Sequence, residues 1–292
     1  MDFGVFLPQL RMEYPTIEER VLAAEEAGFR SAWFMDHMAP PAIPDQPSLE
    51  GWSLVTFLAA RTTQIRLGHL VLCAPFRHPA LLAKMAATLD VLSNGRLEIG
   101  IGWGSVPAEL VRYGFGDETP AVKSKRLEDA LAVMELMFSG EEFDYDGHFV
   151  TIRNGVCRPT PVQDKIPVHI GGGGRKLTMP LVARYADWWN CPAYATKEYE
   201  QLRPLAGKAR VSVQRVIGLA RSSAERDEVT ATAEKRFGGW GGLVTGTPDE
   251  VAASLSGDVA LGAELAIMQF SDFGRSETLR FFMEEVAPAV TA

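Results

Sequence analysis

A histidine that could transfer protons follows an apolar run near the N-terminus, where the stretch SAWFMDH ends at Asp36 and His37. Imidazole titrates near neutral pH, so His37 could accept or donate a proton during a reaction. A single histidine beneath a loop is equally often a structural side chain, and the sequence leaves both interpretations open. The other four histidines form no H-x-H or H-E-x-x-H motif. This pattern disfavours a metal hydrolase and predicts no metal site.

Four consecutive glycines, Gly171, Gly172, Gly173 and Gly174, separate an apolar run from a helical pattern in the stretch PVHIGGGGRKLTMPLVARYA. Glycine is costly to order, so such a run indicates either a slack loop or a place where a ligand approaches bare backbone. The turn from a strand into a helix is a setting in which backbone N–H groups meet an anion. Arg175 and Lys176 add positive charge there. We therefore predict a phosphate-binding loop.

A second glycine-rich stretch, GIGWGS, contains Gly100, Gly102 and Gly104. Its G-x-G-x-G spacing differs from the dinucleotide fingerprint, and no acidic partner follows at the usual distance. Two interpretations remain, a tight turn at a strand end and a place where a flat ring approaches the backbone. The chain has no G-x-S-x-G elbow, which disfavours a serine hydrolase. A Schiff-base aldolase needs a desolvated lysine at a strand end, and it is disfavoured because the only candidate, Lys176, lies beside the glycine run.

Composition limits the classes of partner. The chain has 292 residues, a hydrophobic content of 47% and a formal net charge of -8, with no basic tract. Nucleic acids and membranes are therefore not expected as partners. The three cysteines, Cys73, Cys157 and Cys191, are far apart and give neither a disulfide framework nor a metal-ligand spacing. Without a signal-peptide pattern at the first residues, we expect a cytoplasmic protein.

Short apolar runs alternate with helical patterns along the chain. The expected strands cover residues 3–8, 31–36, 65–72, 96–102, 167–172, 187–190, 215–220 and 263–270. The expected helices cover residues 16–29, 49–62, 78–93, 121–140, 177–186 and 247–257. Alternation of this kind implies parallel strands joined by right-handed crossovers. We predict an α/β fold, a single (β/α)8 TIM barrel over residues 1–292, with a doubly wound sheet as the alternative.

Local signals mark some of the boundaries. Thr16 with Glu19, and Thr247 with Glu250, have the spacing of a capping box at a helix start, and Gly28 marks a helix end. Residues 143–165 break the alternation and are predicted to form an insertion. Within it, the YDGHF stretch is typical of a short hairpin that turns at Asp146 and Gly147. In a (β/α)8 barrel, functional residues gather at the carboxyl ends of the strands, where Asp36, His37 and both glycine stretches would lie.

Together these segments resemble the bacterial luciferase-like family of flavin and deazaflavin enzymes, over nearly the whole chain. The resemblance rests on SAWFMDH, on the long segment from residue 65 to residue 104, on PVHIGGGGRKLTMPLVARYADWWN and on GTPDEVAASL. It implies FMN or the deazaflavin F420 as the cofactor, with Asp36 and His37 near the ring. It also implies a non-proline cis peptide within His69, Leu70 and Val71. Gly102 and Gly104 would flank the ring or its ribityl chain, and Gly171 to Gly174 with Arg175 would hold the cofactor phosphate.

The branch it is most similar to implies an F420-dependent oxidoreductase. Hydride would pass between the deazaflavin C5 and a small hydrophobic substrate, with His37 moving the proton. Phe6, Met38, Trp103 and Trp189 would line the substrate pocket. The alternatives are a monooxygenase that uses reduced FMN, O2 and a separate flavin reductase, and a non-catalytic flavin-binding barrel. A flavin or F420 reductase is a possible partner, and the resemblance implies a homodimer.

Two positions after the G-x-G turn refine this expectation. The sugar-phosphate dehydrogenase branch has an acid directly after its G-x-G turn, where this chain has Ser105. We therefore do not expect activity on glucose 6-phosphate. Glu109 is interpreted as an acid that opens a helix rather than as a catalytic group.

Overall fold

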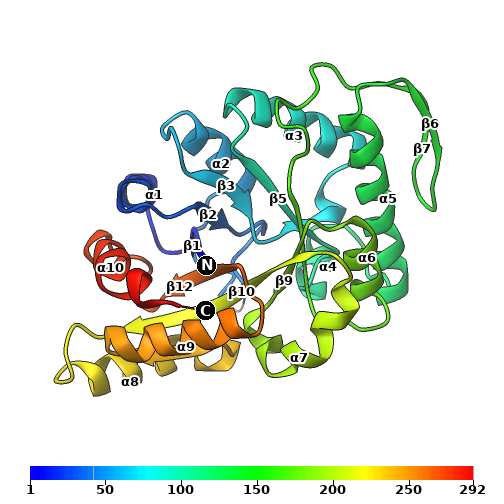
Figure 1. Cartoon of the computed structure of the whole chain (residues 1–292). Helices are drawn as coiled ribbons and strands as arrows, with labels where there is room; N and C mark the ends of the chain where they lie inside the picture. The colour runs from blue at the N-terminus through cyan, green and yellow to red at the C-terminus, as the bar shows by residue number, and fades with distance from the viewer. Residues whose placement is uncertain (42, 292) are drawn as a thin grey trace.

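Eight parallel strands close into a barrel in the computed structural model, which describes residues 1–41 and 43–291 (Figure 1). Neighbours pair in the order β1, β2, β3, β5, β8, β9, β10 and β12, and β12 returns to β1. The strands are β1 (Asp2–Phe6), β2 (Ser31–Phe34), β3 (Arg66–His69), β5 (Leu97–Gly102), β8 (Val168–Gly171), β9 (Trp188–Cys191), β10 (Arg210–Leu219) and β12 (Leu265–Phe270). The (β/α)8 barrel predicted from the sequence is confirmed, with a strand at each expected place.

Two further short strands extend the parallel sheet. β4 (Leu72–Cys73) follows a break after β3 and pairs with the end of β5. β11 (Leu243–Gly246) pairs with the second half of β10, whose first half pairs with β9. The expected strand over residues 65–72 covers both β3 and β4, and β11 was not predicted from the sequence.

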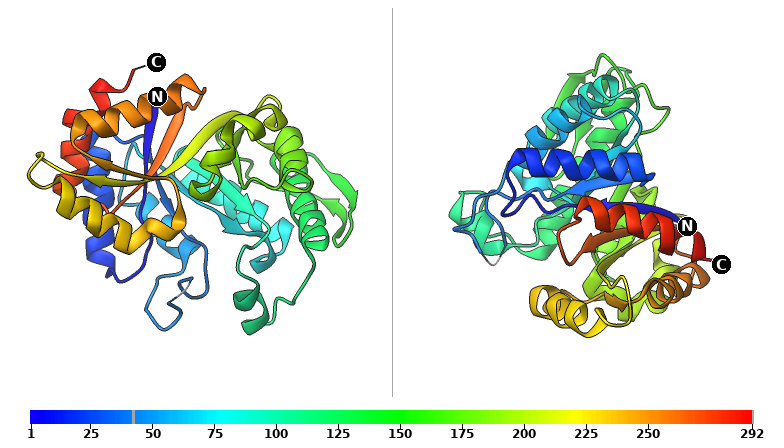
Figure 2. Two further views of the ribbon diagram at one scale, coloured as in Figure 1. Left: turned by 90° about the horizontal axis from the view of Figure 1, so that it is seen from below. Right: turned by 90° about the vertical axis from the view of Figure 1, so that its left-hand side faces the viewer.

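Helices surround the strands on the outside (Figure 2). They are α1 (Tyr14–Ala27), α2 (Gly51–Ala59), α3 (Pro79–Leu92), α4 (Pro107–Arg112), α5 (Pro120–Phe138), α6 (Thr178–Tyr185), α7 (Tyr199–Leu202), α8 (Arg226–Phe237), α9 (Pro248–Ala260) and α10 (Ser276–Phe281), with 3-10 turns η1 (Ala74–Phe76), η2 (Ala193–Glu198) and η4 (Gly238–Trp240). The six predicted helices are present. α8 escaped prediction because its only buried side chains are Ala233 and Phe237, too few to give an apolar stripe.

The observed ends of α1 and α9 can be compared with the capping residues predicted from the sequence. α9 begins with the predicted capping box, in which Thr247 and Glu250 satisfy each other's backbone amides. α1 ends at Gly28, which takes the left-handed conformation with φ of 89°. The predicted start of α1 at Thr16 is wrong, because the helix begins at Tyr14 with a proline in its first turn.

Large apolar side chains fill the barrel interior. They are Phe6, Trp33, Met35, Trp188, Leu265 and Ile267. The Trp33 indole fits inside because both neighbouring strands carry a glycine beside it: a Cβ atom on Gly68 would lie 2.7 Å from the ring, and one on Gly4 would lie 3.0 Å from its Nε1. Side chains on the opposite faces of the strands pack against the surrounding helices.

A buried ion cluster sits near the amino ends of β2, β3 and β5. Glu98 accepts a hydrogen bond from His169 Nε2 at 2.6 Å and pairs with Arg30 Nη2 at 2.8 Å and with Arg66. Burial alone would raise the pKa of Glu98, but the hydrogen bond from His169 and the charges of His169, Arg30 and Arg66 lower it to about 2. The carboxylate is therefore ionised inside the barrel, opposite the end where function is expected.

The hairpin predicted at Asp146 and Gly147 forms between β6 (Phe143–Asp146) and β7 (Thr151–Gly155). It projects beside α5 at the outer edge of the molecule (Figure 1). Asp129 of α5 holds it by accepting hydrogen bonds from the Tyr145 hydroxyl and from the amides of His148 and Phe149.

Among the helices that the structure describes, none is long and apolar enough to span a lipid bilayer.

Candidate active site

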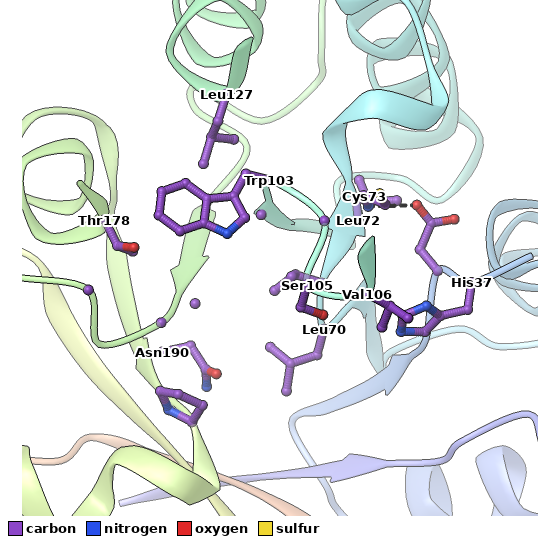
Figure 3. A pocket seen from close by; sticks show the side chains of 18 of the residues that line it. His37, Leu70, Leu72, Cys73, Trp103, Ser105, Val106, Leu127, Thr178 and Asn190 are labelled. Carbon is purple, nitrogen blue, oxygen red and sulfur yellow. Dashed lines mark hydrogen bonds between the residues drawn. The ribbon is translucent and has the colours of Figure 1, made fainter. Parts of the chain in front are cut away.

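A cavity of about 430 Å³ opens at the carboxyl ends of the barrel strands. Its walls come from the ends of β2, β3, β5, β8 and β9 and the segments that follow them, from Gln214 within β10, and from α4, α5 and the start of α6. The volume falls within the ordinary range for small-molecule and cofactor sites. Figure 3 shows Trp103, Leu127 and Thr178 together on one side of the cavity and His37 on the opposite side.

Many of the predicted site residues meet at this cavity. Those that line it are Asp36, His37, Leu70, Val71, Gly102, Trp103, Gly104, Gly171, Gly172, Gly173 and Gly174. They come from four different strand ends, as expected for a barrel of this kind. Their roles toward a cofactor stay predictions.

His37 is paired with an acid. Its Nδ1 atom lies 2.8 Å from Glu109 Oε2, and the backbone amides of Met38 and Ala39 donate to Glu109 Oε1 at 2.6 and 3.2 Å. Glu109 is 8% exposed and His37 21% exposed. A carboxylate can only accept hydrogen bonds, so in this contact His37 donates from Nδ1 and its Nε2 remains available to another partner.

Glu109 does lie in the first turn of α4, as the sequence analysis expected. The carboxylate nevertheless faces His37 and lines the cavity, so the interpretation as a helix-start acid alone is incomplete.

Asp36 lies at the cavity, but its carboxylate is held by other groups. It accepts hydrogen bonds from Arg77 at 2.7 and 2.9 Å and from the Cys73 amide at 2.8 Å. This arrangement ties the end of β2 to β4 and thereby fixes the backbone that carries His37. Asp36 is a positioning residue in this structure rather than a free ligand.

A cis peptide bond joins Leu70 to Val71, within the three residues for which the resemblance implies one. Glycines surround the Val71 side chain. A Cβ atom on Gly102 would lie 2.9 Å from Val71 Cγ2, whereas one on Gly171 would lie 3.5 Å from Val71 Cγ1, an ordinary contact. Packing therefore requires a glycine at position 102 but not at position 171, where the missing side chain leaves room in the cavity.

The glycine loop is built around its neighbours. Gly172 has φ of 129°, which side chains rarely adopt, and its carbonyl accepts a hydrogen bond from Trp189 Nε1 at 2.9 Å. Thr178, the first residue of α6, also lines the cavity, and a Cβ atom on Gly174 would lie 2.8 Å from its hydroxyl. The loop is thus fixed by the fold and is not a slack connection.

Five predicted residues lie away from the cavity. Phe6 fills the barrel interior, and Trp189 points outward, where it stacks on Tyr199. Met38 is 48% exposed outside the cavity and contributes its backbone amide to Glu109.

His69 and Arg175 are the other two. His69 faces α2, where it is fully buried against the Trp52 ring at 5.4 Å, and this burial lowers its pKa. Arg175 is exposed and donates a hydrogen bond to Gln201 at 2.6 Å.

Several polar lining residues escaped prediction. Besides Glu109 they are Cys73, Ser105, Thr178, Asn190, Tyr194 and Gln214. Cys73, Ser105 and Asn190 lie within the strand ends at which the sequence predicts functional residues, but no role was predicted for them. Burial and the nearby Asp36 raise the pKa of the Cys73 thiol to about 12, which makes it a poor nucleophile. Within the described part of the chain, no cluster of His, Cys, Asp and Glu could hold a metal ion.

Known proteins share parts of this sequence. An uncharacterised protein of Mycobacterium tuberculosis is 34% identical over 182 residues, which cover 57% of this chain and 64% of the relative. An F420-dependent glucose-6-phosphate dehydrogenase of Nocardia farcinica is 30% identical over 230 residues, covering 73% of this chain and 66% of the relative. The chain thus spans just under two thirds of the length of these curated relatives.

The fold has solved counterparts. A monooxygenase from Streptomyces bottropensis superposes with a TM-score of 0.83 at 18% identity and covers all of both chains. The sequence profile of the luciferase-like monooxygenases matches residues 1–228, from β1 through the start of α8. That match spans every residue found at the cavity, and the chain belongs to the luciferase-like monooxygenase family.

Proposed function

We propose that the protein is an F420-dependent oxidoreductase that acts on an uncharged, largely apolar alcohol or carbonyl compound. The observation that carries the proposal is the His37–Glu109 pair, which stands at the edge of a cavity large enough for a cofactor ring. The relative from Nocardia farcinica, whose name includes F420 dependence, supports the choice of cofactor.

The residues present fit a deazaflavin. Gly171 leaves space beside Val71 that a side chain would fill, and Trp103 provides a flat apolar wall. The glycine loop and the Thr178 hydroxyl provide polar groups on the side away from His37. When bound, F420 would supply a hydride donor or acceptor at its C5 carbon.

The chain's own contribution is the movement of a proton. Glu109 fixes the orientation of His37 and keeps its Nδ1 protonated, so Nε2 takes the hydroxyl proton of an alcohol substrate. In the opposite direction, the same nitrogen returns a proton to the carbonyl oxygen. Charge that develops on the imidazole is stabilised by the Glu109 carboxylate at 2.8 Å.

The lining supports the substrate class. No lysine or arginine is found among the described residues that line the cavity, while Leu70, Leu72, Val106, Leu110 and Leu127 give it apolar walls. A sugar phosphate would bring a dianion beside the His37–Glu109 pair without a cation to receive it. We therefore place glucose 6-phosphate outside the substrate range.

The test is an F420 reduction assay on the purified protein with apolar secondary alcohols and with glucose 6-phosphate. We expect turnover with the alcohols only, and a His37→Ala variant that binds F420 normally but turns over at least about 100-fold more slowly. Failure of the wild-type protein to bind F420 would overturn the proposal.

A reduced-FMN monooxygenase is the second candidate, favoured by the family and by the superposition on the monooxygenase from Streptomyces bottropensis. Oxygen consumption with reduced FMN, supplied by an added flavin reductase, would identify it. A protein that binds either cofactor but shows no turnover in both assays would instead be a binding barrel.

A further inference from the structure

Gln269 carries a buried side-chain amide without a hydrogen-bond partner. It lies near the carboxyl end of β12, with 1% of its surface exposed. Neither its Oε1 nor its Nε2 forms a hydrogen bond with any residue that the structure describes. Unpaired donors and acceptors in a protein interior are costly, and each one in a native fold needs a physical reason. A ligand that pairs with this amide would supply the reason.

A second glutamine shows how a structural amide is held in the same part of the barrel. Gln9 follows β1 and is also 1% exposed. Its Nε2 donates to the Met35 carbonyl at 2.6 Å, and its Oε1 accepts from the Met35 amide at 2.9 Å. Both halves of that amide therefore join the segment after β1 to the segment after β2. Gln269 has no such structural contact within the described part of the chain.

The strand register places Gln269 beside the cavity. Alternate residues of β12 face the barrel interior, where Leu265 and Ile267 pack, so Gln269 also faces inward. Ile267 pairs with Gln214 of β10, and Gln214 lines the cavity. Gln269 is the next inward position of β12 toward the carboxyl end, where the cavity opens. A change in its side-chain torsions brings its amide to the cavity wall that Gln214 forms.

Gln214 adds a donor on the same wall. Its Oε1 accepts from the Ala193 amide at 3.5 Å, whereas its Nε2 donates to no residue in the described ranges. Two carboxamides on neighbouring strands offer N–H donors and a carbonyl acceptor but no charge. They favour an uncharged group that both donates and accepts hydrogen bonds. A carboxylate would leave the Gln269 oxygen facing another acceptor.

The cofactor ring is proposed to lie on the other side of the barrel. In the closed order of eight strands, β3 is opposite β10, and β5 is opposite β12. Val71 follows β3 and Trp103 follows β5, and these are the residues that would stand beside the ring. The wall formed by β10 and β12 is therefore left for the substrate.

We propose that Gln269, together with Gln214, binds a carboxamide or lactam group of the substrate, away from the carbon that exchanges hydride. The inference rests on the proposed function and narrows its substrates to alcohols or ketones that carry such a group. The substrate N–H donates to Gln269 Oε1, and Gln269 Nε2 donates to the substrate carbonyl oxygen. Gln269 acts as a specificity-determining residue and takes no part in proton transfer.

Two matched alcohols test the inference. A secondary alcohol with a terminal carboxamide is compared with the alcohol in which an isopropyl group replaces the carboxamide, over a series of spacer lengths. F420 reduction gives kcat/KM, and the rise in Tm that each alcohol causes reports binding without turnover. We expect the wild-type protein to prefer the carboxamide about tenfold or more, and Gln269→Met to lose that preference. The affinity of the variant for F420 should equal that of the wild-type protein.

Thermal unfolding of the same variants gives an independent readout. Methionine is close to glutamine in size and has no amide. Gln269→Met removes polar atoms that have no partner, so its Tm should rise. The matched control Gln9→Met removes two hydrogen bonds that the fold uses, so its Tm should fall. A Gln269→Met variant that loses stability as the control does would overturn the inference, because its amide would then have a structural role.

The remaining outcomes separate the inference from the proposed function. Turnover of both alcohols without a preference for the carboxamide would keep the proposed function and overturn the inference. Weaker F420 binding by Gln269→Met, with the preference kept, would assign the amide to the imide edge of the cofactor ring and also overturn it. If neither alcohol reduces F420 but the carboxamide raises the Tm only when Gln269 is present, the proposed function fails and the inference stands. If the wild-type protein neither turns over nor binds the carboxamide alcohol, both fail.

Discussion

The carboxylate of Glu109 lies 2.8 Å from Nδ1 of His37, although 72 positions separate the two residues along the chain. The contact joins the end of β2 to α4 across the mouth of the barrel. It joins the histidine that the sequence singled out and an acid interpreted only as the start of a helix into one hydrogen-bonded pair. The same carboxylate also holds two backbone amides, so it fixes the loop as well as the ring.

Glu109→Gln should slow turnover without weakening cofactor binding. The amide is nearly isosteric with the carboxylate but does not stabilise positive charge on His37. We expect kcat to fall about 100-fold, within the range usual for general acid–base groups. Steady-state kinetics beside a cofactor titration would measure both effects. A loss of affinity with unchanged kcat would instead assign Glu109 to binding.

Gly171→Ala should fold normally and bind cofactor poorly. The added methyl group makes only ordinary contacts with Val71 and Asn190 but occupies the space beside them in the cavity. An overpacked contact of this kind lowers cofactor affinity by about tenfold. Thermal unfolding and a cofactor titration of the same preparation would separate the two effects.

Gly257→Ala is the matched control, because Gly257 lies inside α9 with open space around it. It should gain about 0.5–1 kcal/mol of stability and leave cofactor binding unchanged. Unaltered affinity in Gly171→Ala would show that no ligand approaches that position.

Trp189→Phe tests the support of the glycine loop. Phenylalanine keeps the stacking on Tyr199 but removes the hydrogen bond to the Gly172 carbonyl. A single hydrogen bond contributes about 1 kcal/mol, so we expect about fivefold weaker binding of a phosphorylated cofactor. The affinity for riboflavin should change less, and an equal loss for both ligands would argue against a loop effect.

The Glu98 cluster predicts how stability depends on acid. The pKa of Glu98 in the folded protein, about 2, lies below its ordinary value of 4.5. The ionised carboxylate therefore stabilises the fold fully above about pH 4.5, and this contribution, about 3 kcal/mol, is lost as the pH falls through about 2. Urea unfolding at a series of pH values should show that loss in the wild-type protein.

Glu98→Gln should remove that part of the pH dependence and leave Arg30 and Arg66 without their shared carboxylate. We expect a loss of about 3–5 kcal/mol in the free energy of unfolding at neutral pH. A variant with wild-type stability and an unchanged acid transition would show that other carboxylates control it.

The barrel could be predicted because each strand is a short apolar run between turn residues. The spacing of apolar residues and the turn residues between elements are local properties of the sequence. In α9 they predict the helix together with the capping box at its start. α8 and β11 could not be predicted in this way, because α8 buries few apolar side chains and Val244 is the one buried apolar side chain of β11.

The candidate site was predictable as a set of strand ends but not as a set of contacts. Trp188 and Trp189 are adjacent in β9, and one faces the barrel interior while the other faces the helices. The alternation is certain from the sequence, but its phase depends on how the sheet closes. Glu109 was misjudged for a related reason, since only the folded chain brings α4 over the end of β2.

β12 pairs with both β1 and β10, and it is the strand that completes the barrel. Every residue that lines the cavity precedes it in the sequence. During synthesis, the ribosome releases all the cavity residues before the strand that closes the ring around them. The nascent chain therefore exposes the apolar walls of the cavity until β12 emerges. A chain truncated before residue 265 would be bound by chaperones or degraded by proteases, and would not fold into a weakly active protein.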